Sequence, residues 1–168
     1  MLGGWSSTID PIQLADKGAR LCGELPLKGM ARLVEMSADA DGTVCVDLEF
    51  GRGSGDGLRV MRGAITACIY LTCQRCMQPM RVELKSEPRL VLLRAGERED
   101  LLEAGEAMLV EHPLTLGALV EHELLLEMPM VPLHPVDRCP AADRSTQQAE
   151  AKRSSPFSVL ERLKRTDR

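Results

Sequence analysis

Apolar and polar residues alternate along much of the first 93 positions, and a period of two is typical of strands with one buried face. The clearest run is residues 43–50, Thr-Val-Cys-Val-Asp-Leu-Glu-Phe. We interpret as strands residues 23–27, 32–36, 43–50, 58–72 and 80–93, with a short addition at 109–114. Turn signals separate these runs at hairpin spacing, without strand–helix–strand alternation. The pattern therefore predicts an α+β fold with a mainly antiparallel sheet of about five to six strands.

The period changes to that of a helix at residues 115–128. Apolar side chains recur there on one face: Leu116, Leu119, Val120 and Leu124. Thr115 can cap the first turn, and Pro129 stops the helix. Glu121 and Glu123 are expected to face solvent. We expect this one helix to pack across the sheet.

The length of 168 residues suits one domain with a substantial core. Residues 1–140 are predicted to form this single α+β domain. Residues 141–154 are small and polar, which predicts a flexible linker. Residues 155–168 are predicted to form a short amphipathic tail helix, because a Ser-Pro start is followed by apolar residues at helical spacing and by a basic last turn.

The charge and the aromatic content of the chain limit the kinds of partner that it can bind. The net charge of −4 is uneven, since residues 141–168 hold seven basic and four acidic side chains and the preceding part is acidic. An acidic body argues against wrapping nucleic acid over a large face, although the basic tail can still contact phosphate. With four aromatic residues in the chain, few rings are available to stack on bases. No apolar run approaches the roughly 20 residues that span a bilayer, and no secretory signal is visible, so a cytoplasmic protein is expected.

The six cysteines do not follow the pattern of a secreted disulfide framework. Cys22, Cys45 and Cys68 occur singly in predicted strands. A reduced cysteine in such a position is usually a small buried apolar residue. We therefore expect these three thiols to lie in the core.

Cys73 and Cys76 form a Cys-x-x-Cys pair between two predicted strands. This spacing in a hairpin turn aims both sulfurs at a single point, which is usually a metal ion. A closed tetrahedral zinc site needs two more ligands, and the chain offers His134 and Cys139. Arg75 and Arg81 would favour the thiolate form of the pair by their charge. Zinc is therefore the candidate cofactor.

A thiol redox pair is the alternative for Cys73 and Cys76. Thioredoxin-like pairs lie at the start of a helix that follows a strand. Residues 80–84 alternate instead as a strand does, which favours the metal site.

No catalytic motif is found in the chain. The glycine-rich residues 51–57 lack the Lys-Ser/Thr ending of a phosphate-binding loop. There is no Gly-x-Ser-x-Gly or His-Glu-x-x-His motif, and His112 and His122 are expected to be solvated or hydrogen-bonded structurally. The sequence predicts no enzyme and no small-molecule substrate.

Three stretches taken together are distinctive. They are Leu-Thr-Cys-Gln-Arg-Cys-Met-Gln-Pro at residues 71–79, Leu-Val-Glu-His-Glu-Leu-Leu-Leu-Glu-Met-Pro-Met-Val-Pro-Leu-His at residues 119–134 followed by Cys139, and Ser-Pro-Phe-Ser-Val-Leu-Glu-Arg-Leu-Lys at residues 155–164. Asp10-Pro11 near the start fits the same pattern. In order and spacing the chain resembles the YceD family, the large ribosomal RNA subunit accumulation proteins of bacteria and plastids.

The resemblance implies a non-enzymatic role in accumulation of large-subunit ribosomal RNA. The implied partners are ribosomal RNA or ribosome-assembly proteins. Candidate contact residues are Arg75, Arg81, Phe157, Arg162, Lys164 and Arg165. Some relatives carry further cysteines around positions 134–139, which implies a metal site there. Two alternatives stay open, an acidic protein-binding adaptor without RNA contact and a thiol redox protein using Cys73 and Cys76.

Overall fold

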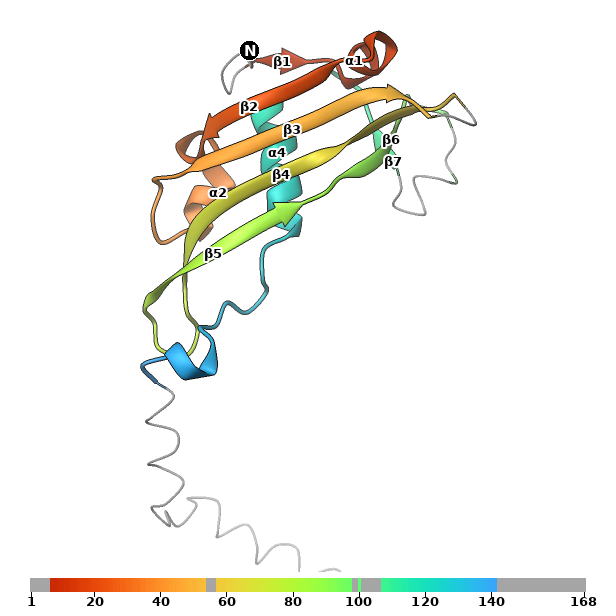
Figure 1. Cartoon of the computed structure of the whole chain (residues 1–168). Coiled ribbons are helices and arrows are strands. Elements are labelled where there is room, and N and C mark those ends of the chain that lie inside the picture. Colours follow the sequence, from red (N-terminus) through yellow and green to blue (C-terminus); the bar gives the residue numbers. More distant parts are fainter. Residues whose placement is uncertain (1–6, 54–56, 98–99, 101–106, 142–168) are drawn as a thin grey trace, which may run out of the picture.

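The structure is a computed structural model, which describes residues 7–53, 57–97, 100 and 107–141. A six-stranded twisted sheet forms its centre, and helix α4 (Leu116–Leu126) crosses one face (Figure 1). The opposite face of β2 to β5 carries no helix in this view. The predicted α+β class with one helix packed on a mainly antiparallel sheet is confirmed.

The sheet has the order β2-β3-β4-β6-β7, and β5 also pairs with β4. The strands are β2 (Arg20–Pro26), β3 (Thr43–Arg52), β4 (Arg59–Thr72), β5 (Pro79–Ser86), β6 (Arg89–Leu93) and β7 (Ala107–Leu109). All pairs are antiparallel except β6 with β7. A separate two-stranded sheet joins β1 (Thr8–Ile9) to β8 (Leu114–Thr115).

Strand β4 organises the sheet because it pairs with β3 along one edge and with both β5 and β6 along the other. The register that joins Ile65 to Ser86 is the same one that joins Arg62 to Arg89. The single strand expected over residues 80–93 is therefore interrupted rather than displaced. Pro88 explains the interruption, since it has no N–H for the ladder.

Two of the helices, α1 and α4, begin at side-chain caps. Asp10 accepts hydrogen bonds from the N–H groups of Ile12 and Gln13 and so starts α1 (Pro11–Lys17). The Thr115 hydroxyl accepts from the N–H of Ala118 at 3.2 Å and starts α4. Two 3-10 turns, η1 (Leu27–Gly29) and η2 (Val136–Arg138), also lie in the described part of the chain. The predicted helix over residues 115–128 is confirmed, with its last helical residue at Leu126.

Two expectations about side chains and backbone around α4 are wrong. Residues 32–36 are not a strand but belong to helix α2 (Ala31–Met36). Glu121 and Glu123 do not face solvent but are buried. The helix α2 and the burial of Glu121 have one cause, because the Glu121 carboxylate accepts hydrogen bonds from the N–H groups of Arg32 and Leu33 at the start of α2. Glu123 reaches the hydroxyl of Ser86 at 3.2 Å.

The buried core is aliphatic, as the scarcity of aromatic residues requires. It lies between α4, α1 and the inner faces of β3 and β4, and Phe50 is the one ring in the cluster of described buried residues. The predicted linker and tail helix, residues 141–154 and 155–168, fall outside the described residues except for Ala141. The division into domains stays a prediction.

Cys22, Cys45 and Cys68 are not in the core, contrary to expectation. Cys22 and Cys45 are exposed and Cys68 is half-buried. Successive side chains in a strand point to opposite faces, and Val44 and Val46 occupy the buried positions of β3. Cys45 must therefore point to the uncovered face.

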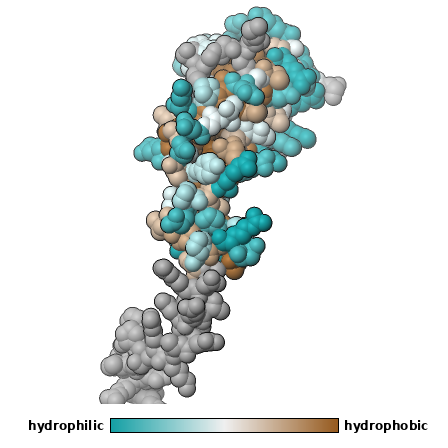
Figure 2. All heavy atoms as spheres, turned by 60° about the vertical axis from the view of Figure 1, so that its left-hand side comes forward, coloured by the Kyte–Doolittle hydropathy of each residue, from teal (hydrophilic) through white to brown (hydrophobic). Residues whose placement is uncertain are grey.

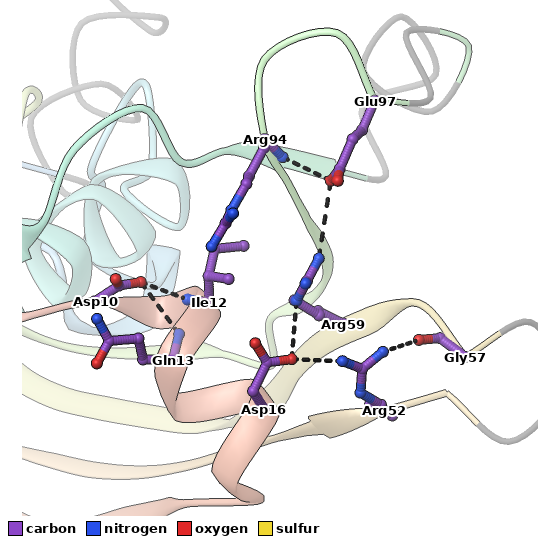
Figure 3. A network of polar contacts seen from close by, with 9 residues as sticks. All are labelled: Asp10, Ile12, Gln13, Asp16, Arg52, Gly57, Arg59, Arg94 and Glu97. Carbon is purple, nitrogen blue, oxygen red and sulfur yellow. Dashed lines mark hydrogen bonds and ion pairs between the residues drawn. The ribbon is translucent and has the colours of Figure 1, made fainter.

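A polar network fixes α1 to the sheet where β3 ends and β4 begins (Figure 3). Asp16 accepts hydrogen bonds from Arg52 at 2.7 Å and from Arg59 at 3.0 Å. Arg59 also lies 3.9 Å from Glu97, which accepts from the backbone N–H of Arg94. Since Arg52 and Arg59 pair across β3 and β4, one carboxylate anchors the helix to both strands. The hydrogen bond that Asp16 accepts from Arg59 is the main reason that the pKa of this carboxyl is lowered.

None of the helices in the described part of the chain is long and apolar enough to cross a membrane.

Candidate metal centre

The turn that joins β4 to β5 is closed by its own backbone. The N–H of Cys73 donates to the carbonyl of Gln78, and the N–H of Met77 donates to the carbonyl of Cys73, both at 2.9 Å. Met77 takes a left-handed conformation with φ of 60°, which is uncommon for any residue other than glycine. This tight turn places Cys73 and Cys76 on the same side.

The chain that follows α4 returns to this turn (Figure 1). The N–H of Gln74 donates to the carbonyl of Pro132 at 2.9 Å, so the two segments lie side by side. Turn η2 then brings Cys139 back toward Cys76. We call residues 73–78 and 130–141 together the knob.

Four potential ligands meet in the knob: Cys73, Cys76, His134 and Cys139. One sulfur or ring nitrogen from each lies within 4.8 Å of the others. The Sγ of Cys76 is 3.3 Å from Nδ1 of His134, and the backbone N–H of His134 points to the Sγ of Cys73 at 3.4 Å. Cys73 and Cys139 are buried, and the other two are half-buried. The four residues that the sequence grouped are therefore brought together in space.

The surroundings favour a thiolate at Cys73. Burial by itself would raise the pKa of this thiol, but N–H groups of His134, Cys76 and Arg75 donate to its sulfur and lower the pKa to about 5. The pKa of Cys76 is raised, first by burial and also by its closeness to the sulfurs of Cys73 and Cys139. The N–H groups that point to the sulfur of Cys73 stabilise its thiolate form. Two more thiols lie close to this negative charge, and a bound cation would stabilise the whole group.

The donor set fits zinc. Three sulfurs and one imidazole nitrogen are the Cys₃His set of closed structural sites. Bonds of about 2.0–2.3 Å in a tetrahedron place ligand atoms about 3.3–3.8 Å apart, and the Cys76–His134 distance of 3.3 Å agrees with this. All six cysteines are free, so no disulfide competes for these sulfurs.

The rest of the knob offers little else to hold residues 130–141 in place. Its larger apolar side chains stay exposed, among them Met130, Val131 and Val136. Cys139 is the one member of this segment that is buried. The order of the segment therefore depends mainly on the cluster of cysteines and His134.

The predicted contact residues lie in different places. Arg75 is in the turn and exposed, and its backbone N–H helps to hold Cys73. Arg81 lies on β5, and its Nε donates to the Sγ of Cys68 at 2.6 Å. Its charge therefore acts on the thiol of Cys68, and not on those of Cys73 and Cys76 as was expected. Phe157, Arg162, Lys164 and Arg165 fall outside the described residues.

The exposed apolar residues of the knob were not predicted from the sequence. A usable signal was present, because residues 129–136, Pro-Met-Val-Pro-Leu-His-Pro-Val, are apolar yet punctuated by prolines. Such a run fits neither a helix nor a paired strand, so its side chains have no periodic face to bury.

Comparison with known proteins identifies the family. The family described as large ribosomal RNA subunit accumulation protein YceD matches residues 61–164. A protein of Haemophilus influenzae named Large ribosomal RNA subunit accumulation protein YceD is 28% identical over 165 residues, covering 94% of each chain. No solved structure matches significantly. The matched region begins in β4 and contains the whole knob, so the chain belongs to the YceD family.

Proposed function

We propose that this protein supports accumulation of the large-subunit ribosomal RNA and so contributes to ribosome biogenesis. The supporting observation is the match to a relative that carries this role in its name, which extends over 94% of both chains. A match of that extent includes the knob and all elements of the sheet. Ribosomal RNA or a ribosome-assembly protein is the proposed partner.

We propose further that the protein acts without catalysis and that zinc is bound at Cys73, Cys76, His134 and Cys139. Four protein ligands close a tetrahedral site, so no position is left for a substrate or an activated water. Bound zinc would neutralise the crowded thiolates and supply folding energy to the knob. In this proposal the metal shapes a binding surface.

The metal proposal is tested by measuring metal content. We expect the purified protein to hold about one zinc per chain by mass spectrometry of the native protein, as four ligands form one site. Cys76→Ser should lose most of it. Cys45→Ser is the matched control, since Cys45 is exposed on the sheet and should leave the zinc content unchanged. Equal zinc in both variants would place the metal elsewhere.

The functional proposal is tested by the ratio of large- to small-subunit ribosomal RNA in cells depleted of the protein. We expect the ratio to fall and to recover with wild type and with Cys45→Ser. Cys73→Ser should rescue poorly if the knob carries the function. An unchanged ratio on depletion would refute the proposed role. The hypothesis that Cys73 and Cys76 form a redox pair would then be favoured.

RNA contact is a separate question from the role itself. The basic residues Arg162, Lys164 and Arg165 are proposed to contact phosphate. Binding of the full chain to large-subunit ribosomal RNA should then weaken steeply as salt increases. Replacing the three by glutamine should flatten that slope. Binding that does not depend on salt would favour a protein partner instead.

A further inference from the structure

The knob exposes more large apolar side chains than its small size would lead one to expect. Figure 2 shows it as a lower lobe with brown and tan residues on its surface. The exposed apolar residues of the knob are Met77 (67%), Met130 (99%), Val131 (61%), Leu133 (40%) and Val136 (69%). Several exposed apolar residues gathered on one part of a monomer mark an interaction surface.

Met77 shows that the exposure is not a by-product of folding. Its left-handed φ of 60° is a conformation for which glycine is the usual residue. A methionine in this conformation strains the backbone. Its exposed side chain makes no core contacts that would offset the cost of the strain. Methionine is well suited to a contact surface because its side chain is flexible and polarisable.

A groove lies beside these residues, at the point where the described chain ends. It is lined by Arg75, Cys76, Met77 and Gln78 on one side and by Pro140 and Ala141 on the other. The last described residue, Ala141, is thus part of the groove wall. Any segment that follows Ala141 starts at this surface.

The following sequence contains one suitable apolar segment. Residues 142–154 include no large apolar side chain, whereas Phe157, Val159, Leu160 and Leu163 follow within seven positions. The 15 residues between Ala141 and Phe157 span at most about 50 Å when extended, and much less as a coil. A tether of this kind holds its segment at an effective concentration on the order of millimolar, so even a weak contact would be populated.

We infer that residues 155–164 of the same chain dock on the apolar surface of the knob through Phe157, Leu160 and Leu163. Both parts of this contact lie within the matched region of the family, which includes the knob and ends at Lys164. The docked segment would leave Arg162, Lys164 and Arg165 free to contact a partner. The inference concerns contacts within the chain and does not depend on the proposed role in ribosomal RNA accumulation.

The test uses the full chain with ¹³C-labelled methionine methyl groups, observed by NMR. Phe157 is the only ring in the docking segment, so its ring current reports on nearby methyl groups. The methyl signals of Met77 and Met130 are assigned with Met77→Leu and Met130→Leu. We expect both to show contacts to the Phe157 ring and to shift in Phe157→Leu. Met61, which is fully buried, should not move and reports that the fold is intact.

A second variant separates docking from the loss of the ring. Leu160→Ser with Leu163→Ser keeps Phe157 but weakens the apolar contact, and it should shift the same two methyl signals. Arg144→Ser, in the polar stretch before the segment, is the matched control and should shift neither. If Met77 and Met130 do not respond to Phe157→Leu or to the double variant, the inference is wrong. A response that disappears on dilution would also overturn it, because docking would then be onto a second copy.

Discussion

Glu121 joins α4 to α2, where its partner Arg32 lies 89 positions earlier in the sequence. Helix α2 has no side-chain cap of its own at Met30. The carboxylate of Glu121 instead accepts from the N–H of Arg32 at 2.7 Å and from the N–H of Leu33 at 3.2 Å, and it also pairs with the Arg32 side chain. A carboxylate at a helix N-terminus is favoured both by the free N–H groups and by the helix dipole.

Removing this cap should destabilise the fold. We expect Glu121→Ala to lower the free energy of unfolding by about 2–3 kcal/mol, since two backbone donors, one buried and one partly buried, lose their partner. Urea unfolding followed by circular dichroism measures the change. Glu127→Ala, at the C-terminal end of α4, is the control, because Glu127 is exposed, and it should change stability by less than about 0.5 kcal/mol. Similar losses in both variants would argue against capping.

Gly63 is required for the close packing of β4 on β3. A Cβ at this position would overlap the backbone carbonyl oxygen of Asp47 and lie 2.9 Å from the Cα of Leu48. We therefore expect Gly63→Ala to destabilise the protein by about 3 kcal/mol, since backbone atoms cannot move aside cheaply. Gly51→Ala, on β3, meets nothing within 4 Å and should be tolerated. The unfolding midpoints of the two variants test the difference, and equal midpoints would contradict it.

At the scale of elements, α1 is attached to the sheet by charge as well as by its apolar face. Ile12 and Ala15 are buried against the core, while Asp16 holds Arg52 and Arg59 at the other side of the helix. The hydrogen bond from Arg59, with the charges of both arginines, lowers the pKa of Asp16. A folded-state pKa below the unfolded value means that this carboxylate stabilises the fold when it is ionised.

The stabilisation of the fold by Asp16 should decrease as the pH falls. The contribution of Asp16 is fully present above the unfolded pKa of about 3.9 and is lost as the pH falls through the lower folded value. Asp16→Asn should therefore unfold at lower urea than wild type at pH 7, and the two midpoints should converge near pH 2. Asp41→Asn, in the exposed loop before β3, serves as the control. A difference that is constant with pH would show that ionisation of Asp16 is not the cause.

At the scale of the molecule, the residues that the structure describes form two parts with different sources of stability. The sheet and its helices share an aliphatic core, whereas the knob relies on the Cys73, Cys76, His134 and Cys139 cluster. Metal binding in such a site is itself folding free energy for the segment that it orders. Stability is then expected to differ between the two parts.

Removing the proposed zinc with a chelator should loosen the knob selectively. We expect hydrogen exchange to accelerate in residues 130–139, because few other contacts hold that segment. The central pair of β3 and β4 should stay protected, since its hydrogen bonds and core contacts do not involve the cluster. Hydrogen exchange with mass spectrometry, before and after chelation, provides the measurement. A uniform rise across the sheet would mean that the metal supports the whole fold.

Much of the fold could be predicted from local pattern. Strands β3 and β4 and helix α4 were predicted close to their observed bounds, because alternation, helical spacing and the Thr115 cap act within a few residues. The prediction failed where a distant partner decides the outcome. Residues 32–36 look like a strand in isolation, and the carboxylate that caps them as a helix comes from α4. Cys45 was expected to be buried on its residue type alone, although the alternation of residues 43–50 places it on the polar face, opposite Val44 and Val46.

In the candidate metal centre, too, local features could be predicted from the sequence and long-range ones could not. The sequence by itself determined the ligand types, the Cys-x-x-Cys turn and the strands on either side, since these depend on residue chemistry and short spacing. Only the tertiary structure decided that His134 and Cys139, about 60 positions away from the turn, return to within 4.8 Å of its sulfurs. It also decided that Glu121 is a buried cap for a helix that lies far from it in sequence. These outcomes depend on packing between distant segments, which no local pattern encodes.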